Sequence, residues 1–388
     1  MRMLNRWLVL ALHALACTSL LAAPFIPASD DEVLETLPEV RDATLTMLKR
    51  EQSALRARPG ELALASAFAR RAIAAARASG DPRYLGQARA ALAPWWSAGE
   101  APPVALLLRA TVKQSLHDFP GALADLDRLL AIAPGDAQAR LTRATVRNVL
   151  GRHADALADC DALPRDTPPL VVTACRADAA SRAGRARTAY DVLARGLADS
   201  RADASLRAWA STIAGEIAAR LDAADAAERQ FRLSLALDAG DPYTLGAYAD
   251  FLLDRGRRRE AVALLARHTR NDALLLRYVI ALRDVDTAAF ERHRVELAAR
   301  VDASRRRGDG VHLREEARYA LDIERDPEAA LALARANWNV QREPADVRVL
   351  AEAARAAGDA GAMRIVSDWT TATGLEDTRV AALLKGGA

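Results

Sequence analysis

Apolar residues recur along most of the chain with the spacing of amphipathic helices, in paired segments of about 12 to 15 residues. The stretch LGRHADALADCDAL, Leu150 to Leu163, is typical of the junction between two such segments. Gly151 follows one apolar-periodic segment, a basic and polar turn comes next, and Ala156 lies in the second segment. A glycine at the end of a helix and a short polar turn predict a helix-turn-helix hairpin here.

The same hairpin pattern recurs along the chain. Ala122, Ala156 and Ala189 occupy matching positions in successive units, at nearly equal intervals. One hairpin cannot bury its apolar stripe alone, so the units are expected to stack on one another. Small residues occupy the positions where paired helices must approach closely, in the pairs Ala110 and Ala122, Ala144 and Ala156, Ala177 and Ala189, Gly215 and Ala227, and Ala249 and Ala261.

These small residues, together with Leu150 and Gly151 and the closing Pro134 and Pro168, resemble the signature of the tetratricopeptide repeat. The resemblance extends from about Pro103 to His268 and becomes loose outside that range. It implies an all-α fold, a right-handed α-solenoid of stacked hairpins. It also implies a concave groove lined by the first helix of each unit, which in that family holds peptides or partner proteins, and it implies no reaction.

The pattern divides the chain into five regions. We expect a signal peptide over 1–23, a helical or linker segment over 24–58 and a degenerate N-terminal hairpin over 59–102. Well-formed repeats follow over 103–270, and degenerate repeats with a C-terminal capping helix over 271–388. Within the last region, the segment around Phe290 to Arg306 is typical of an unusually long helix, where the solenoid either continues or bends.

The first residues differ in composition from the rest. Arg2 and Arg6 precede an apolar run from Trp7 to about Ala23, which is too short for a convincing membrane span and fits a secretory signal. The protein is therefore expected to be periplasmic or secreted. Two alternatives stay open: a lipoprotein acylated at Cys17, which would associate with the membrane, and an uncleaved membrane anchor.

Export changes how the remaining cysteines are interpreted, because disulfides persist in oxidising compartments. Cys160 lies in the second helix of one unit and Cys175 in the first helix of the next. Antiparallel helices joined between them would bring both to the same height. A disulfide joining two hairpins is one prediction, and two small buried thiols without a bond are the alternative.

The charge pattern and the motifs exclude several classes of function. The chain of 388 residues has a formal net charge of +3, and its arginines alternate with acidic residues, so no basic face for nucleic acid is expected. No glycine-rich nucleotide motif, nucleophile elbow or zinc-protease motif occurs, and we expect no catalytic residue, no cofactor and no metal. His312 and Glu316 have the spacing of metal ligands on a helix, but without a second histidine nearby they are interpreted as a surface helix start.

Two rows of residues are expected to face the groove in successive first helices. One row turns acidic and the other ends in aromatic residues, which suits a peptide with basic and apolar side chains. The alternative is a solvated face, because Arg182 and Arg220 lie four residues after Asp178 and Glu216 and could form intrahelical salt bridges. The rows are Thr111, Thr145, Asp178, Glu216 and Asp250, and Val104, Gln138, Val171, Trp209 and Tyr243; the predicted partner-binding residues are Asp178, Trp209, Glu216, Tyr243 and Asp250.

Two further observations bear on the partner. Leu107 and Thr111 replace the lysine and asparagine pattern with which some family members clamp a C-terminal carboxylate, so binding of a chaperone tail is disfavoured. Trp95 and Trp96 end a helical segment, where paired tryptophans either fill a gap between neighbours or contact a partner.

These observations favour a non-catalytic scaffold of the cell envelope that binds a protein or peptide through its groove. The alternative is a lipid-anchored structural or assembly component of a membrane complex. An enzyme with a site built from residues distant in sequence is a third hypothesis, which no motif supports.

Overall fold

The computed structural model describes residues 43–307 and 312–386. The chain divides into two units, Met1–Thr46 and Met47–Ala388, and the account below concerns the second. The predicted signal peptide over 1–23, Cys17 included, lies outside the described residues.

The described part of the chain is helical and contains no strand, which confirms the predicted all-α class. The N-terminal region holds α2 (Ala43–Ala57), α3 (Leu62–Ser79), α4 (Arg83–Ala91) and the short α5 (Ala93–Trp96). The central helices are α6 (Pro103–Ser115), α7 (Phe119–Ile132), α8 (Ala137–Val149), α9 (His153–Asp161), α10 (Pro169–Ser181), α11 (Ala186–Ala198), α12 (Ala204–Arg220), α13 (Ala224–Leu237), α14 (Pro242–Asp254) and α15 (Arg258–Leu265). The C-terminal helices are α16 (Asp272–Leu282), α17 (Thr287–Arg307), α18 (Leu313–Arg318), the π-helix η1 (Tyr319–Glu324), α19 (Pro327–Trp338), α20 (Pro344–Ala356), α21 (Ala360–Thr373) and α22 (Thr378–Lys385).

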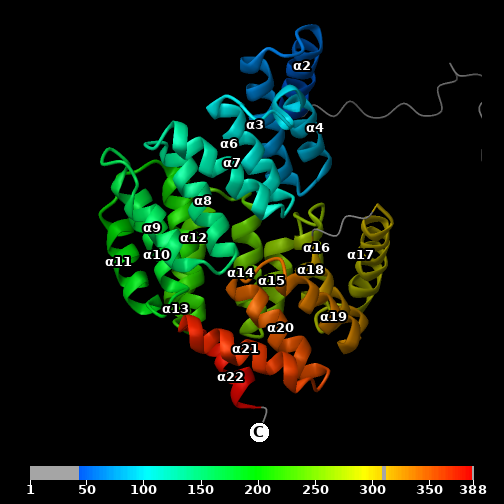
Figure 1. Ribbon diagram of the computed structural model, residues 1–388. Coiled ribbons are helices and arrows are strands. Elements are labelled where there is room, and N and C mark those ends of the chain that lie inside the picture. Colours follow the sequence, from blue (N-terminus) through cyan, green and yellow to red (C-terminus); the bar gives the residue numbers. More distant parts are fainter. Residues whose placement is uncertain (1–42, 308–311, 387–388) are drawn as a thin grey trace, which may run out of the picture. The chain divides into compact units, whose positions relative to one another are not determined.

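Consecutive helices pack as hairpins, and each hairpin packs on the next (Figure 1). The first helices of the hairpins from 103 onward are the even-numbered ones, α6 to α16, followed by α18 and α20. The long helix expected around Phe290 to Arg306 is α17, which has 21 residues. The stack of paired helices predicted from the repeat is thus present, and it continues through the degenerate region.

The small residues lie where two helices of a hairpin touch. Ala110, Ala122, Ala227 and Ala249 have no exposed surface. A Cβ added to Gly215 would lie 2.8 Å from the Cε1 atom of Phe231 in the partner helix α13. A larger side chain at these positions would push the helices apart, because protein interiors have no spare volume.

Aspartate and proline define where many helices begin. Asp118, Asp136, Asp203 and Asp241 each accept a hydrogen bond from a backbone N–H in the first turn of the following helix. These caps satisfy donors that have no partner inside the helix. Capping makes the hairpin boundaries a local property of the sequence.

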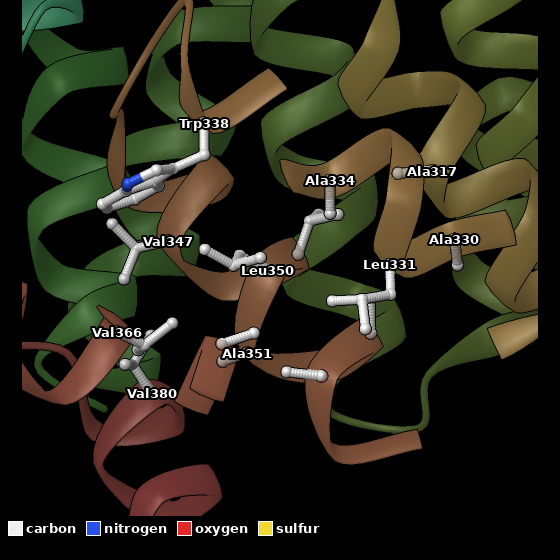
Figure 2. Close-up of a cluster of buried hydrophobic side chains, with 14 of the residues drawn as sticks. Ala317, Ala330, Leu331, Ala334, Trp338, Val347, Leu350, Ala351, Val366 and Val380 are labelled. Carbon is white, nitrogen blue, oxygen red and sulfur yellow. The ribbon is translucent and has the colours of Figure 1, made fainter. Parts of the chain in front are cut away.

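Buried apolar clusters follow the hairpins from one end of the second unit to the other. The largest is contributed by α18 to α22, where alanines of α18 and α19 meet Leu350 and Val347 of α20 (Figure 2). Val366 of α21 and Val380 of α22 close this cluster. The helices after residue 312 therefore form a packed core of their own, although their repeat pattern is weak in the sequence.

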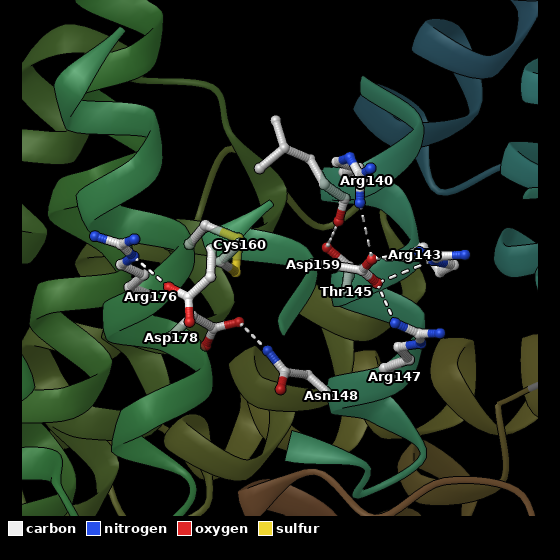
Figure 3. Close-up of a disulfide and its surroundings, with 12 residues drawn as sticks. Arg140, Arg143, Thr145, Arg147, Asn148, Asp159, Cys160, Arg176 and Asp178 are labelled. Carbon is white, nitrogen blue, oxygen red and sulfur yellow. Dashed lines mark hydrogen bonds and ion pairs between the residues drawn. A yellow bond between two sulfur atoms is a disulfide. The ribbon is translucent and has the colours of Figure 1, made fainter. Parts of the chain in front are cut away.

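The structure joins Cys160 and Cys175 in a disulfide, with their Cα atoms 5.7 Å apart (Figure 3). Cys160 lies on α9 and Cys175 on α10, so the bond connects two successive hairpins, as one of the two alternatives predicted. Both residues are buried, at 1% and 6% exposure.

The C-terminal helices also contact hairpins that lie far earlier in the sequence. The backbone N–H of Arg342 donates to the Val149 carbonyl at 2.7 Å, and Thr378 Oγ1 donates to the Arg220 carbonyl at 3.2 Å. Arg379 donates to the Asp254 carbonyl at 3.1 Å. These acceptors are at the C-terminal ends of α8, α12 and α14, where carbonyl groups lack partners inside the helix.

Trp95 and Trp96 pack against separate clusters of buried residues. The guanidinium of Arg89 lies 5.2 Å from the centre of the Trp96 ring. The tryptophans thus fill space between neighbouring helices, which was one of the two interpretations of this pair.

Candidate functional site

Three of the five predicted partner-binding residues line one pocket. Glu216 of α12 and Tyr243 and Asp250 of α14 surround a pocket of about 180 Å³, which we call the polar pocket. Asp178 is next to it, because its carboxylate binds Arg182, which lines the pocket. Trp209 is 42% exposed and is not among the lining residues.

The polar pocket is built from the first helices of successive hairpins. Arg182 directly follows α10, Arg220 ends α12, Gly246 comes from α14 and Arg277 from α16. Arg314 and Glu315 of α18, with Glu343 to Ala345 at the start of α20, complete the wall. First helices therefore supply the walls of this pocket, and the first helices of the later, degenerate units contribute to it as well.

Charges in the polar pocket balance. Its lining contains four arginines, Arg182, Arg220, Arg277 and Arg314, and four carboxylates, Glu216, Asp250, Glu315 and Glu343. What the pocket can bind therefore depends on which of these groups are already paired with one another.

The carboxylates of the predicted acidic row are already bound to groups of the chain itself. Asp250 accepts from Arg277 at 2.8 Å and from Arg318 at 2.7 Å. Burial alone would raise the pKa of Asp250, but these two guanidinium groups outweigh burial and lower it. Asp178 binds Arg182 and the side-chain amide of Asn148, each at 2.9 Å. Arginines of the chain itself therefore already neutralise Asp178 and Asp250. That this row binds basic side chains of a partner stays a prediction.

The predicted intrahelical salt bridges form only in part. Arg182 pairs with Asp178 four residues earlier and lies 3.7 Å from Glu343. Arg220 makes no such pair with Glu216; its Nη2 donates instead to Ser181 Oγ at 2.8 Å. Glu216 accepts a hydrogen bond from the Tyr243 hydroxyl at 2.8 Å.

Burial sets the electrostatics of Glu216 and Arg220. It raises the pKa of Glu216 and lowers that of Arg220, because removal of water disfavours both charged forms. The neighbouring Arg182 guanidinium opposes the shift at Glu216 and adds to the one at Arg220.

The unsatisfied polar atoms of the pocket are donors. Arg182 Nη1 and Arg220 Nε are buried without a hydrogen-bond partner, whereas no side-chain oxygen of the lining residues is left in that position. A buried donor without an acceptor costs about 1–3 kcal/mol, and more for a charged group. The pocket is thus chemically suited to receive an acceptor, above all an anionic one.

Sequence reasoning missed the arginines and carboxylates contributed by α16, α18 and α20. Arg277 is the next member of the predicted row that ends in Trp209 and Tyr243, because the interval from Tyr243 to Arg277 equals the repeat interval from Ala122 to Ala156. Arg314, Glu315 and Glu343 carry no comparable repeat signal. Their positions follow from tertiary packing of the degenerate units.

The described residues hold no group of three or more side chains that could bind a metal ion. His312 precedes α18, as the interpretation of a helix start requires. None of the helices over 43–307 and 312–386 is both long and apolar enough to cross a membrane.

No family model and no curated protein matches the sequence. Among solved structures, a tetratricopeptide repeat protein from Parabacteroides merdae has 13% identity and a TM-score of 0.37, over 74% of this chain and 98% of its own. Yeast Tom70 has 12% identity and a TM-score of 0.35, over 89% of this chain and 92% of its own. The P58(IPK) TPR domain has 15% identity and a TM-score of 0.20, over 82% and 99%.

The fold rests on the chain's own helices, which pair in sequence order and meet at the small residues of each repeat. The described chain is an all-α stack of helical hairpins similar to the tetratricopeptide repeat.

Proposed function

We propose that this protein is a non-catalytic interaction scaffold that takes an acidic side chain of a partner protein into the polar pocket. The carrying observation is that two buried arginine donors, Arg182 Nη1 and Arg220 Nε, form no hydrogen bond. Glu343 Oε1 lies 3.7 Å from Arg182 Nη1, which is too far for a hydrogen bond. A carboxylate would satisfy them with charge-assisted hydrogen bonds, which are about twice as strong as neutral ones.

Size supports a side chain rather than a whole ligand. The pocket measures about 180 Å³, below the roughly 300–1,000 Å³ of sites that enclose a complete small molecule. The exposed Tyr243 and Trp209 offer rigid apolar area for the rest of a partner segment. The proposed partner therefore presents an acidic residue flanked by apolar ones.

We further propose that the protein acts outside the cytoplasm, in the periplasm or as a secreted protein. The disulfide between Cys160 and Cys175 supports this location, because such bonds persist in oxidising compartments. The basic and apolar N-terminal stretch supports it independently.

The test is an affinity capture from the envelope of the producing cell, with cross-linking and mass spectrometry. A partner bound by the wild type should be lost with Arg220→Gln and retained with Arg229→Gln, an exposed arginine of α13 that serves as the matched control. Excess poly-glutamate should compete for the pocket, whereas poly-lysine should not.

Three results would overturn the proposal. Equal capture by wild type and Arg220→Gln would move the interface elsewhere. Competition by poly-lysine but not by poly-glutamate would indicate a partner with basic side chains. Incorporation of labelled palmitate that is lost with Cys17→Ala, with capture unaffected by Arg220→Gln, would favour the lipid-anchored assembly component.

A further inference from the structure

A second cavity lies where the hairpin of α3 and α4 meets α16, α17 and α18. It measures about 360 Å³ and is lined from segments that are far apart in sequence but adjacent in space. We call it the apolar cavity, because its walls include Ala76 of α3, Leu85 of α4, Leu116 after α6, Leu276 of α16, and Leu297 and Val301 of α17.

Gly80 and Asn271 lie together at one edge of the cavity. Gly80, at the end of α3, has φ +73°, and a Cβ there would lie 2.6 Å from Asn271 Nδ2. Asn271 in turn caps α16 through its Oδ1, which accepts from the Leu274 N–H at 3.2 Å. The apolar cavity is therefore flanked by a close contact between two helix ends.

The volume and the lining of the cavity suit a small ligand. Its volume falls within the range of about 300–1,000 Å³ that is typical of small-molecule sites, which are mostly apolar with a few polar groups. The leucine and valine side chains of the walls offer water few hydrogen-bond partners. Replacement of that water by an alkyl group would therefore lower the free energy.

Most charged groups at the rim are paired with one another. Arg300 binds Asp272 at 2.7 Å, and Arg305 binds Glu316 at 3.0 Å. Glu315 lies 3.5 Å from Arg314. These groups therefore leave little free charge for a ligand.

Arg77 is the exception among the lining cations of the described chain. It forms no hydrogen bond or ion pair, and its side chain is exposed at the cavity. Surrounding protein lowers its pKa by desolvation, with no carboxylate to offset the effect. Asp81 also lines the cavity, but it pairs with Arg83 at 2.6 Å. An anion at this point would meet the positive charge of Arg77.

We propose that the apolar cavity binds an apolar monocarboxylate, with the alkyl chain between the leucine walls and the carboxylate on Arg77. One free cation fits one negative head group, and the leucine and valine side chains of the walls fit an alkyl chain. This site is distinct from the polar pocket, although Ala273 and Glu315 line both.

Titration calorimetry of the purified protein with octanoate, decanoate and dodecanoate tests the proposal. Affinity should rise about fourfold for each added methylene until the cavity is filled. Dodecanol, which lacks the charge, should bind about tenfold more weakly than dodecanoate. Val301→Phe, which reduces the cavity, should weaken dodecanoate more than octanoate.

Arg77→Gln should weaken dodecanoate by about tenfold and leave dodecanol unchanged. Arg70→Gln, an exposed arginine two turns earlier on α3, is the matched control and should bind like the wild type. Because Arg77 is in the last turn of α3, where a cation stabilises the helix end, unfolding of both variants is measured as well.

Several outcomes would overturn the proposal. They are no saturable binding, equal affinity for dodecanol and dodecanoate, or unchanged dodecanoate binding by a folded Arg77→Gln variant. Equal binding of N-acetylleucine would indicate a peptide end instead. Arg220→Gln should retain dodecanoate, and Arg77→Gln should retain the protein partner, so failures of the two proposals are distinguishable.

Discussion

At the scale of single residues, a buried aspartate is repeated with its partners. Asp125 of α7 binds Arg109 and Lys113 of α6, and in the next hairpin Asp159 of α9 binds Arg143 and Arg147 of α8 (Figure 3). Asp125 and Asp159 are 1% and 2% exposed. Asp159 is also 3.8 Å from Arg140 of α8. Each aspartate therefore holds at least two cations of its partner helix, which fixes the register of the hairpin.

Asp125→Asn should lower the free energy of unfolding by about 3 kcal/mol or more, because it leaves the buried Arg109 without a counter-charge. Asp127→Asn, in the same helix, removes an exposed partner of Arg143 and should cost less than about 1 kcal/mol. Chemical denaturation of both variants gives the comparison. Equal losses would mean that the buried aspartate has no special role.

Residue-level reasoning succeeded where the cause was local. The small residues at helix contacts and the turn glycine Gly151 were found because spacing along one hairpin dictates them. The pairing of Asp250 could not be found in this way, because one of its partners, Arg318, is 68 residues away in a unit with a weak repeat.

At the scale of elements, hairpins are the building blocks and the disulfide joins two of them. The connection between α9 and α10 contains Pro164 and Pro168, and α10 begins at Pro169; the fixed backbone angle of proline limits the freedom of this connection. Alternation of paired helices was predictable, since each helix carries its own apolar stripe and many carry their own cap. The departure into η1 before α19 was not predicted.

Reduction of the folded protein should lower its free energy of unfolding by about 3 kcal/mol, the entropic value for a loop of about 15 residues. Cys160→Ser with Cys175→Ser should show the same loss and no further sensitivity to reductant. Mass spectrometry after reduction and alkylation checks the bond directly. Alkylation of both thiols without reductant would show that the bond does not form in the protein.

At the scale of the described molecule, the last helices are held against hairpins from the middle of the chain. Trp369 of α21 packs on the turn between α8 and α9. Its ring centre is 6.4 Å from that of His153, and a Cβ added to Gly151 would lie 2.3 Å from Trp369 Cη2. Glu376 accepts from the Ala186 N–H at the start of α11 at 2.8 Å. Negative charge there also favours the helix dipole.

The stability of this contact should depend on pH. Burial lowers the pKa of His153 from 6.5 to about 4, with Arg182 and Arg220 adding to the effect and Asp178 opposing it. Between pH 4 and pH 6.5, His153 binds a proton more readily in the unfolded chain than in the folded one. The stabilisation by neutral His153 is therefore complete above pH 6.5 and is lost as the pH falls towards 4. The loss should approach about 3 kcal/mol.

Denaturation at pH 7 and pH 4.5 measures this effect. His153→Gln should reduce the difference between the two pH values, and His268→Gln, a histidine outside this contact, should retain it. Tryptophan fluorescence should change first, because Trp369 packs beside His153. If the unfolding free energy of His153→Gln changed with pH as much as that of the wild type, the pH dependence could not be assigned to His153.

The contacts of the C-terminal helices also bear on how such a protein can change over generations. Stacked repeats ordinarily tolerate duplication or loss of a unit, since each unit depends only on its neighbours. Here one continuous segment, from Arg342 to Arg379, must reach the ends of α8, α12 and α14 in order. Inserting or deleting a single hairpin between α8 and α14 would displace those acceptors relative to their donors. We therefore expect the length of this array to be fixed, and its diversity to lie in side chains rather than in the number of units.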